Sequence, residues 1–253
     1  MFTARNYVKA ASLEEAWQLN QKRANAILGG GCWMRLGKRR YDTLIDLGEL
    51  GLDTIEKIEN GIRIGAMTTL RQLETDPLLR EQYGTYFQDS VRHIVGVQFR
   101  NSATVGGSVR SRFGFSDVVT ALLALPHVEV SLYRGGTVSL EKYVRMAYDR
   151  DILQFVTIPE KVDGAVYESV RNSATDLPVL TCAACRTENG YRCAIGGRPG
   201  RAMPVESKTK EDLIAAAKAL PFGDNMRAGA AYRRHLAGVL TKRALQPLEV
   251  EKA

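Results

Sequence analysis

Two short clusters of glycine are the residues whose type and spacing most suggest chemistry. Gly29, Gly30 and Gly31 follow the apolar run "AIL", and Gly106 and Gly107 follow the β-prone run "NSATV". A glycine segment exposes backbone N–H groups with no Cβ in the way, which suits a diphosphate that needs several donors at close range. A tight turn explains either cluster alone, but two of them in one chain suggest a single ligand held from two sides.

Neither cluster has the form of a common nucleotide-binding motif. Gly29–Gly31 lacks the spaced third glycine of the Rossmann fingerprint and an acidic residue beyond a second strand. No Gly-Lys-Ser/Thr occurs, so the P-loop is also excluded. At the far end of the second segment, Asp117 is expected to cap the helix "VVTALLAL".

The cysteines and histidines do not have the spacing of a metal or catalytic site. Cys182 and Cys185 lie in "VLTCAACR", which is typical of a strand, and strand positions three apart point to opposite faces. No His-x-x-x-His or second Cys-x-x-Cys completes a ligand set. We therefore predict buried, reduced cysteines, no metal site and no catalytic side chain.

Composition is that of an ordinary globular protein. The chain has 253 residues, 45% hydrophobic and 25% charged, which allows one to three domains. No apolar run is long enough to span a bilayer and no signal peptide is evident, so a cytoplasmic location is expected. The net charge of +7 comes from short basic clusters without interleaved aromatic residues, so nucleic acid is not expected as a partner.

The hydrophobic pattern predicts strands and helices in irregular alternation. Ser12 begins a helix with the capping-box form, and Thr68 is expected to cap a short one. Asn60-Gly61 and Gly135-Gly136 each predict a hairpin, and a third turn precedes "YRCAIGG". Hairpins in place of βαβ units predict an α+β fold with a domain boundary near residues 160–165. The remaining expected strands are 25–28, 43–47, 151–159, 165–170 and 179–186, and the remaining expected helices are 87–95, 118–125, 210–220 and 226–245.

Several longer motifs occur in an order that is typical of one family. These are "AILGGG", "LIDLGELGLDTIEKIENGIRIGAMTTLRQLE", "FRNSATVGGSV", "SDVVTALLAL" and "YRRHLAGVLTKRAL". Over nearly its whole length the chain resembles the FAD-binding medium subunit of molybdenum hydroxylases, of the xanthine dehydrogenase and carbon monoxide dehydrogenase type. The resemblance implies a PCMH-type FAD-binding domain at 1–162, with α+β subdomains at about 1–52 and 53–162. It also implies a C-terminal α+β domain at 163–253, with a small antiparallel sheet and helices.

The resemblance implies one FAD held by the backbone of both glycine segments. Thr104 resembles a hydroxyl that binds phosphate, Asp117 an acidic residue near the sugar or ribityl chain, and Leu153 an apolar residue near the flavin or adenine. The implied cofactor-binding residues are Ile27, Leu28, Gly29, Gly30, Gly31, Cys32, Trp33, Thr104, Val105, Gly106, Gly107, Ser108, Asp117 and Leu153.

Some residues depart from the family's usual pattern. Cys32 and Trp33 replace a hydroxyl and a polar residue, and Arg110 to Gly114 replace smaller uncharged ones. Arg112 either stabilises anionic reduced flavin or faces solvent or a partner, and the second alternative is favoured. Asp176 matches an aspartate that begins a strand in the family, and we expect it to be structural.

The resemblance implies an electron-transfer subunit of a larger oxidoreductase. Electrons would pass from a molybdopterin-binding large subunit, through [2Fe-2S] clusters of a small subunit, to FAD in this chain and then to NAD+ or another acceptor. The redox chemistry would belong to the cofactor. Two alternatives stay open: a stand-alone FAD reductase of the same broad fold, and a flavin-free scaffold that only joins partner subunits.

Overall fold

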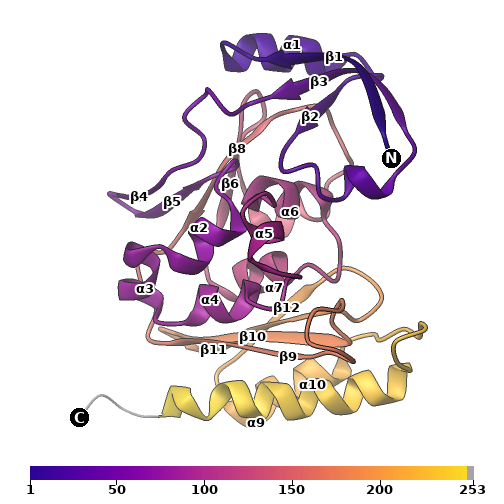
Figure 1. Ribbon diagram of the computed structural model, residues 1–253. Helices are drawn as coiled ribbons and strands as arrows, with labels where there is room; N and C mark the ends of the chain where they lie inside the picture. The colour runs from indigo at the N-terminus through magenta and orange to yellow at the C-terminus, as the bar shows by residue number, and fades with distance from the viewer. Residues whose placement is uncertain (250–253) are drawn as a thin grey trace.

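A three-stranded parallel sheet lies at the N-terminal end of the computed structural model, which describes residues 1–249 (Figure 1). Its strands, in spatial order, are β1 (Thr3–Lys9), β3 (Arg40–Asp46) and β2 (Ala26–Leu28). Helix α1 (Leu13–Gln21) connects β1 to β2, and the Ser12 side chain accepts a hydrogen bond from the Glu15 amide, as the helix-start prediction requires. We expected hairpins and no βαβ units, and this parallel sheet shows that the expectation was wrong for the N-terminal segment. Strand β1 is exposed along most of its length, so it shows no hydrophobic alternation by which to predict it.

A five-stranded antiparallel sheet forms the centre of the molecule. Both predicted hairpins are confirmed within it, at Asn60-Gly61 and Gly135-Gly136. The last of its strands in the sequence pairs with both hairpins and joins them into one sheet. In spatial order the strands are β4 (Ile55–Ile58), β5 (Gly61–Gly65), β8 (Leu153–Ile158), β6 (Glu129–Leu132) and β7 (Gly136–Ser139).

Six short helices lie between the two hairpins, and a seventh follows the second hairpin. Three predictions are off by a few residues. Thr69, not Thr68, caps the first helix, Ile94 and Val95 lie beyond the end of another, and Ser116, not Asp117, caps the helix that Asp117 begins. The helices are α2 (Leu70–Thr75), α3 (Pro77–Tyr83), α4 (Tyr86–Val91), α5 (Val97–Arg100), α6 (Val105–Ser111), α7 (Asp117–Ala124) and α8 (Leu140–Tyr143).

The second glycine cluster lies in a helix and does not follow a strand. Gly106 and Gly107 occupy the first turn of α6, and Thr104 caps that helix by accepting a hydrogen bond from the Gly107 amide. The run "NSATV" forms only one isolated bridge, between Thr104 and Thr69. Its β-branched residues suggested a strand, but the threonine serves as a helix cap.

A four-stranded antiparallel sheet follows, with helices on both faces (Figure 1). Its strands in spatial order are β12 (Met203–Ser207), β11 (Gly190–Gly196), β10 (Leu180–Thr187) and β9 (Ala165–Val170). Helices α9 (Lys210–Ala219) and α10 (Ala230–Leu245) cover one face, while α4 and α7 cover the other. As predicted, Cys182 and Cys185 face opposite sides of this sheet, each in a different hydrophobic cluster.

The chain therefore has the mixed α+β architecture that we expected, and the structure arranges it as three sheets. The boundaries at 52 and 162 stay predictions. Two short 3-10 helices, η1 (Met34–Leu36) and η2 (Pro247–Glu249), complete the elements. Within residues 1–249, no helix is both long enough and apolar enough to cross a membrane.

Candidate functional site

The two glycine segments pack directly against each other. A Cβ on Gly30 would lie 1.6 Å from the carbonyl oxygen of Ser102, so only a glycine fits at this contact. On its other side, the second segment packs on the chain after β5, where a Cβ on Gly106 would lie 2.6 Å from the Ala66 carbonyl oxygen. Segments about 75 residues apart in the sequence are thus brought together at one place by backbone contact.

Two other glycines surround the Thr104 hydroxyl and leave space in front of it. A Cβ on Gly29 or on Gly107 would meet only Thr104 Oγ1, at 2.9 and 3.0 Å. Packing with the rest of the protein therefore does not demand a glycine at Gly107. Within residues 1–249 the amides of Gly30 and Gly31 donate to no other protein group. Bare backbone with free N–H groups is the environment that a phosphate group requires.

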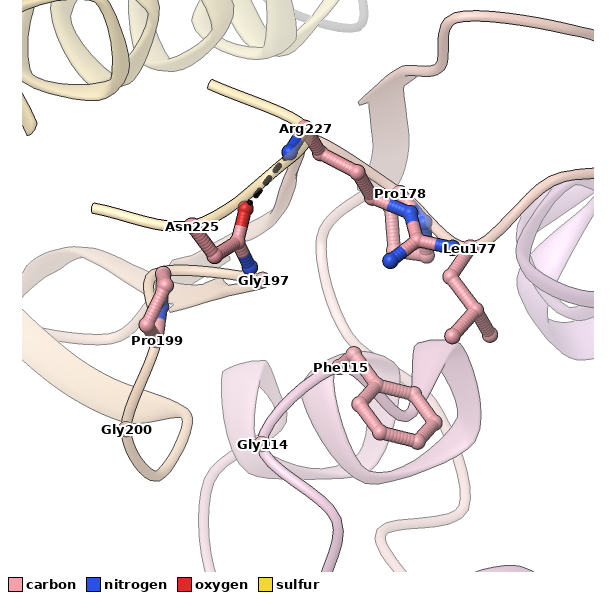
Figure 2. A pocket seen from close by; sticks show the side chains of 9 residues that line it. All are labelled: Gly114, Phe115, Leu177, Pro178, Gly197, Pro199, Gly200, Asn225 and Arg227. Carbon is pink, nitrogen blue, oxygen red and sulfur yellow. Dashed lines mark hydrogen bonds between the residues drawn. The ribbon is translucent and has the colours of Figure 1, made fainter. Parts of the chain in front are cut away.

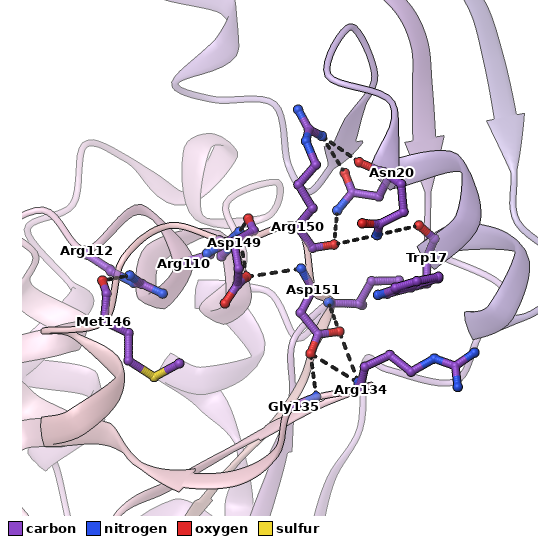
Figure 3. Close-up of polar contacts among 12 residues, drawn as sticks. Trp17, Asn20, Arg110, Arg112, Arg134, Gly135, Met146, Asp149, Arg150 and Asp151 are labelled. Atoms are coloured by element: carbon purple, nitrogen blue, oxygen red, sulfur yellow. Dashed lines mark hydrogen bonds and ion pairs between the residues drawn. The ribbon is translucent and has the colours of Figure 1, made fainter.

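A cavity of about 760 Å³, which we call the Arg150 cavity, opens on one side of the glycine segments. Four arginines and two aspartates contribute to its lining, so its charge favours an anion. Arg150 donates hydrogen bonds to the carbonyl oxygens of Asn20 and Arg23. The Asp151 carboxylate accepts from backbone amides of the turn at Gly135 (Figure 3). The charged lining residues are Arg23, Arg39, Arg110, Arg150, Asp149 and Asp151.

A second cavity of about 510 Å³, the Phe113 cavity, opens on the other side. Its wall carries three aromatic rings close to one another. The ring centroids of Trp33 and Phe113 are 5.1 Å apart, and those of Phe113 and Phe115 are 5.0 Å apart in a stacked arrangement. Such a wall suits a flat aromatic ring system.

The two cavities adjoin at the glycine segments. Five residues line both of them: Ile27, Gly29, Thr104, Gly107 and Arg110. The site thus has a charged cavity, an aromatic cavity and a junction where two glycines, Ile27, Thr104 and Arg110 line both. Each cavity is of the size found for small-molecule sites. Together the adjoining cavities offer space for an elongated ligand that crosses the glycine junction.

Comparison with known proteins agrees with this geometry. The family described as "FAD binding domain in molybdopterin dehydrogenase" matches residues 2–161, which is well over half of the chain. The chain belongs to this family. It is an FAD-binding oxidoreductase subunit of the kind found in molybdenum-containing enzymes.

Individual relatives of this FAD subunit cover almost all of its length. YgfM of Escherichia coli K12 is 28% identical, over 92% of each chain. The xanthine dehydrogenase FAD-binding subunit of Escherichia coli O157:H7 is 26% identical, over 97% of this chain and 96% of the relative. A chain of carbon monoxide dehydrogenase from Hydrogenophaga pseudoflava has the same fold, with a TM-score of 0.82 at 22% identity over 95% of both chains.

Most residues that the sequence implied for FAD binding lie around the two cavities. Besides the residues lining both cavities, Gly106 and Leu153 line the Arg150 cavity. The Phe113 cavity is also lined by Gly30, Gly31, Cys32, Trp33, Ser108 and Asp117. Leu28 and Val105 line neither cavity, and Val105 is buried in the central core.

The Asp117 carboxylate of the FAD subunit is held by its own protein. Asp117 is buried and accepts hydrogen bonds from the Arg171 guanidinium and the Tyr167 hydroxyl. Burial raises the pKa of the Asp117 carboxyl, although Arg171 and Tyr167 both oppose that rise. Tyr167 lies in β9, and Arg171 directly follows this strand. These hydrogen bonds therefore connect a residue that lines the Phe113 cavity to the C-terminal sheet.

Sequence reasoning missed the arginines of the Arg150 cavity in the FAD subunit. Arg23, Arg39 and Arg150 come from three separate segments, and nothing in their spacing indicated that they converge. The sequence "YDRDIL", which ends at Leu153, contains two aspartates and an arginine that all line this cavity, and it was the one available signal.

Arg112 does not face solvent, so the favoured expectation for it was wrong. It is buried, with a φ of 52°, and its guanidinium lies 4.2 Å from the Tyr143 ring centroid and 4.7 Å from that of Tyr148. It donates a hydrogen bond to the Met146 carbonyl oxygen (Figure 3). Arg112 lines neither cavity, and stacking on the tyrosines explains its burial.

A smaller cavity of about 110 Å³ lies where the FAD-binding part meets the C-terminal segments (Figure 2). Gly114 approaches Gly200 so closely that a Cβ on Gly114 would lie 1.6 Å from the Gly200 carbonyl oxygen. Asp176 lies in the loop before β10, so it does not begin a strand, and its carboxylate pairs with Arg227 at 2.8 Å. Asp176 also lines the Phe113 cavity, and its structural role stays a prediction.

Proposed function

We propose that this chain binds one FAD along the two adjoining cavities and transfers electrons as the flavin subunit of a molybdenum hydroxylase complex. The observation that carries the proposal is the junction at Gly29, Thr104 and Gly107, which both cavities share. The diphosphate would lie at this junction, against backbone without side chains.

The character of each cavity assigns the two ends of the cofactor. The aromatic wall of Trp33, Phe113 and Phe115 would hold the isoalloxazine and exclude water from it. The charged Arg150 cavity, with Leu153 in its wall, would hold the adenosine end. FAD when bound supplies acceptance and release of one or two electrons; the chain supplies position and electrostatics.

The partners follow from the kind of enzyme in which this domain occurs. A [2Fe-2S] subunit would deliver electrons that a molybdopterin subunit has taken from an organic substrate, in the cytoplasm. NAD+ or another acceptor would then reoxidise the flavin. In this scheme no side chain of this chain acts as a general acid or base.

Flavin content and co-purification test the proposal separately. Purified protein should show FAD absorbance at one flavin per chain, or acquire it on addition of FAD. A tagged chain should co-purify with molybdenum and iron–sulfur subunits. A folded chain that joins those subunits without flavin would establish the scaffold alternative, and a monomer that reduces its own substrate would establish the stand-alone reductase.

A further inference from the structure

Phosphate binding by backbone groups at the junction leaves one nearby side chain, Arg110, without a role. It lies on α6, one turn after Gly106 and Gly107, and lines both cavities at their junction. Its Nη1 atom is buried and has no hydrogen-bond partner among the described residues. The other buried side-chain nitrogens without a partner belong to Arg112 and Arg171, which line neither cavity.

The rest of the Arg110 guanidinium is held in place. Its Nη2 atom donates to the Asp149 carbonyl oxygen and lies 3.2 Å from the Asp149 carboxylate (Figure 3). The guanidinium carbon lies 5.5 Å from the ring centroid of Tyr148. One terminal nitrogen is therefore engaged while the other, which is shielded from solvent, lacks an acceptor in a residue that lines both cavities.

We infer that Arg110 binds the diphosphate of FAD and is a side-chain determinant of FAD affinity in this chain. The inference rests on the proposed function. Backbone amides supply only partial charges, whereas a guanidinium adds a full charge and a charge-assisted hydrogen bond to a phosphate oxygen. Arg110 thereby distinguishes flavin dinucleotide from flavin without phosphate.

Binding of three probes to the full chain tests this inference. FAD, ADP and riboflavin are titrated into flavin-stripped wild type, Arg110→Gln, Arg110→Lys and Arg134→Gln. Arg134 is the matched control, because its removal changes net charge equally while its guanidinium stacks on Trp17 and pairs with Glu14, outside both cavities. Circular dichroism and thermal unfolding report whether each variant is folded.

We expect Arg110→Gln to weaken FAD and ADP by about 10- to 100-fold and to leave riboflavin unchanged. Arg110→Lys should recover part of the loss, and Arg134→Gln should bind like wild type. Unchanged FAD affinity in folded Arg110→Gln overturns the inference and leaves the proposed function standing. An equal loss for riboflavin also overturns it, since the side chain would then act on the ring or on the fold. Wild-type protein that binds neither FAD nor ADP overturns the proposed function as well.

Discussion

A Cβ placed on Gly30 would stand 1.6 Å from the carbonyl oxygen of Ser102, whereas a Cβ on Gly107 would meet only the Thr104 hydroxyl, at 3.0 Å. The two positions therefore differ in what a side chain would contact. The fold requires glycine at position 30, because any side chain there would collide with the backbone of Ser102. A Cβ at Gly107 would contact the Thr104 hydroxyl and no other protein atom, as expected if the proposed diphosphate lies in front of Gly107.

This difference makes a pair of substitutions informative. Gly107→Val should leave a folded chain that no longer retains FAD, because the branched side chain fills the space of the diphosphate. Gly30→Ala should instead lower thermal stability, since the Ser102 backbone must shift. Flavin absorbance and the midpoint of thermal unfolding distinguish the two effects. Stoichiometric flavin in folded Gly107→Val would refute the placement of the diphosphate.

Cys32 provides a probe of the Phe113 cavity. Its thiol is half-buried in the cavity wall, while Cys182, Cys185 and Cys193 are fully buried. Burial raises the pKa of the Cys32 thiol, so labelling by a maleimide at neutral pH should be slow there. The three buried cysteines should not react, because a maleimide cannot reach them. Bound FAD should protect Cys32 further, as followed by mass spectrometry. An identical labelling rate with FAD bound would place the isoalloxazine elsewhere.

Glu74 and Arg100 form a buried ion pair that fixes the chain just before Thr104. Arg100 Nε and Nη2 lie 2.8 and 2.9 Å from the two carboxylate oxygens of Glu74, and both side chains are 6% exposed. Desolvation acts to raise the pKa of Glu74, but hydrogen bonds from Arg100 and Arg71 outweigh it and hold the pKa below its usual value.

A carboxyl group whose pKa is lowered by folding stabilises the protein above its unfolded pKa, and this stability is lost as the pH falls through the folded value. The free energy of unfolding should therefore exceed that of Glu74→Gln by about 3–5 kcal/mol at pH 7, because the variant leaves Arg100 buried without a counter-ion. This difference should shrink below about pH 4.5. Urea unfolding at several pH values measures it, and a difference independent of pH would contradict the role given to the carboxylate.

Arg233 is fully buried in α10 and fixes the loop before that helix. Its guanidinium donates to the carbonyl oxygens of Val179, Gly223 and Ala228 at 3.0, 2.7 and 2.5 Å. Arg233→Met would leave the Val179 and Gly223 carbonyl oxygens without a donor, and we expect a loss of about 3 kcal/mol or more in the free energy of unfolding. The neighbouring exposed Arg234 is the control, and Arg234→Met should cost less than about 0.5 kcal/mol. Equal effects of the two substitutions would show that the buried hydrogen bonds are not what stabilises the loop.

The sequence by itself determined the local features of this protein. Alternating hydrophobic residues around Asn60-Gly61 and Gly135-Gly136 predicted two hairpins, and the strand period placed Cys182 and Cys185 on opposite faces, because such patterns depend only on near neighbours in the chain. The two glycine clusters indicated a phosphate-binding junction for the same reason: absence of a side chain is visible in the sequence.

Only the tertiary structure decided what surrounds that junction. In the folded chain Gly30 packs on Ser102, and Asp117 pairs with Arg171. One cavity contains four arginines from separate segments: Arg23, Arg39, Arg110 and Arg150. The fold also turns Arg112 inward onto two tyrosines. These contacts join segments that are far apart in the sequence, and their geometry is set by how the sheets and helices pack, which no local pattern of residues specifies.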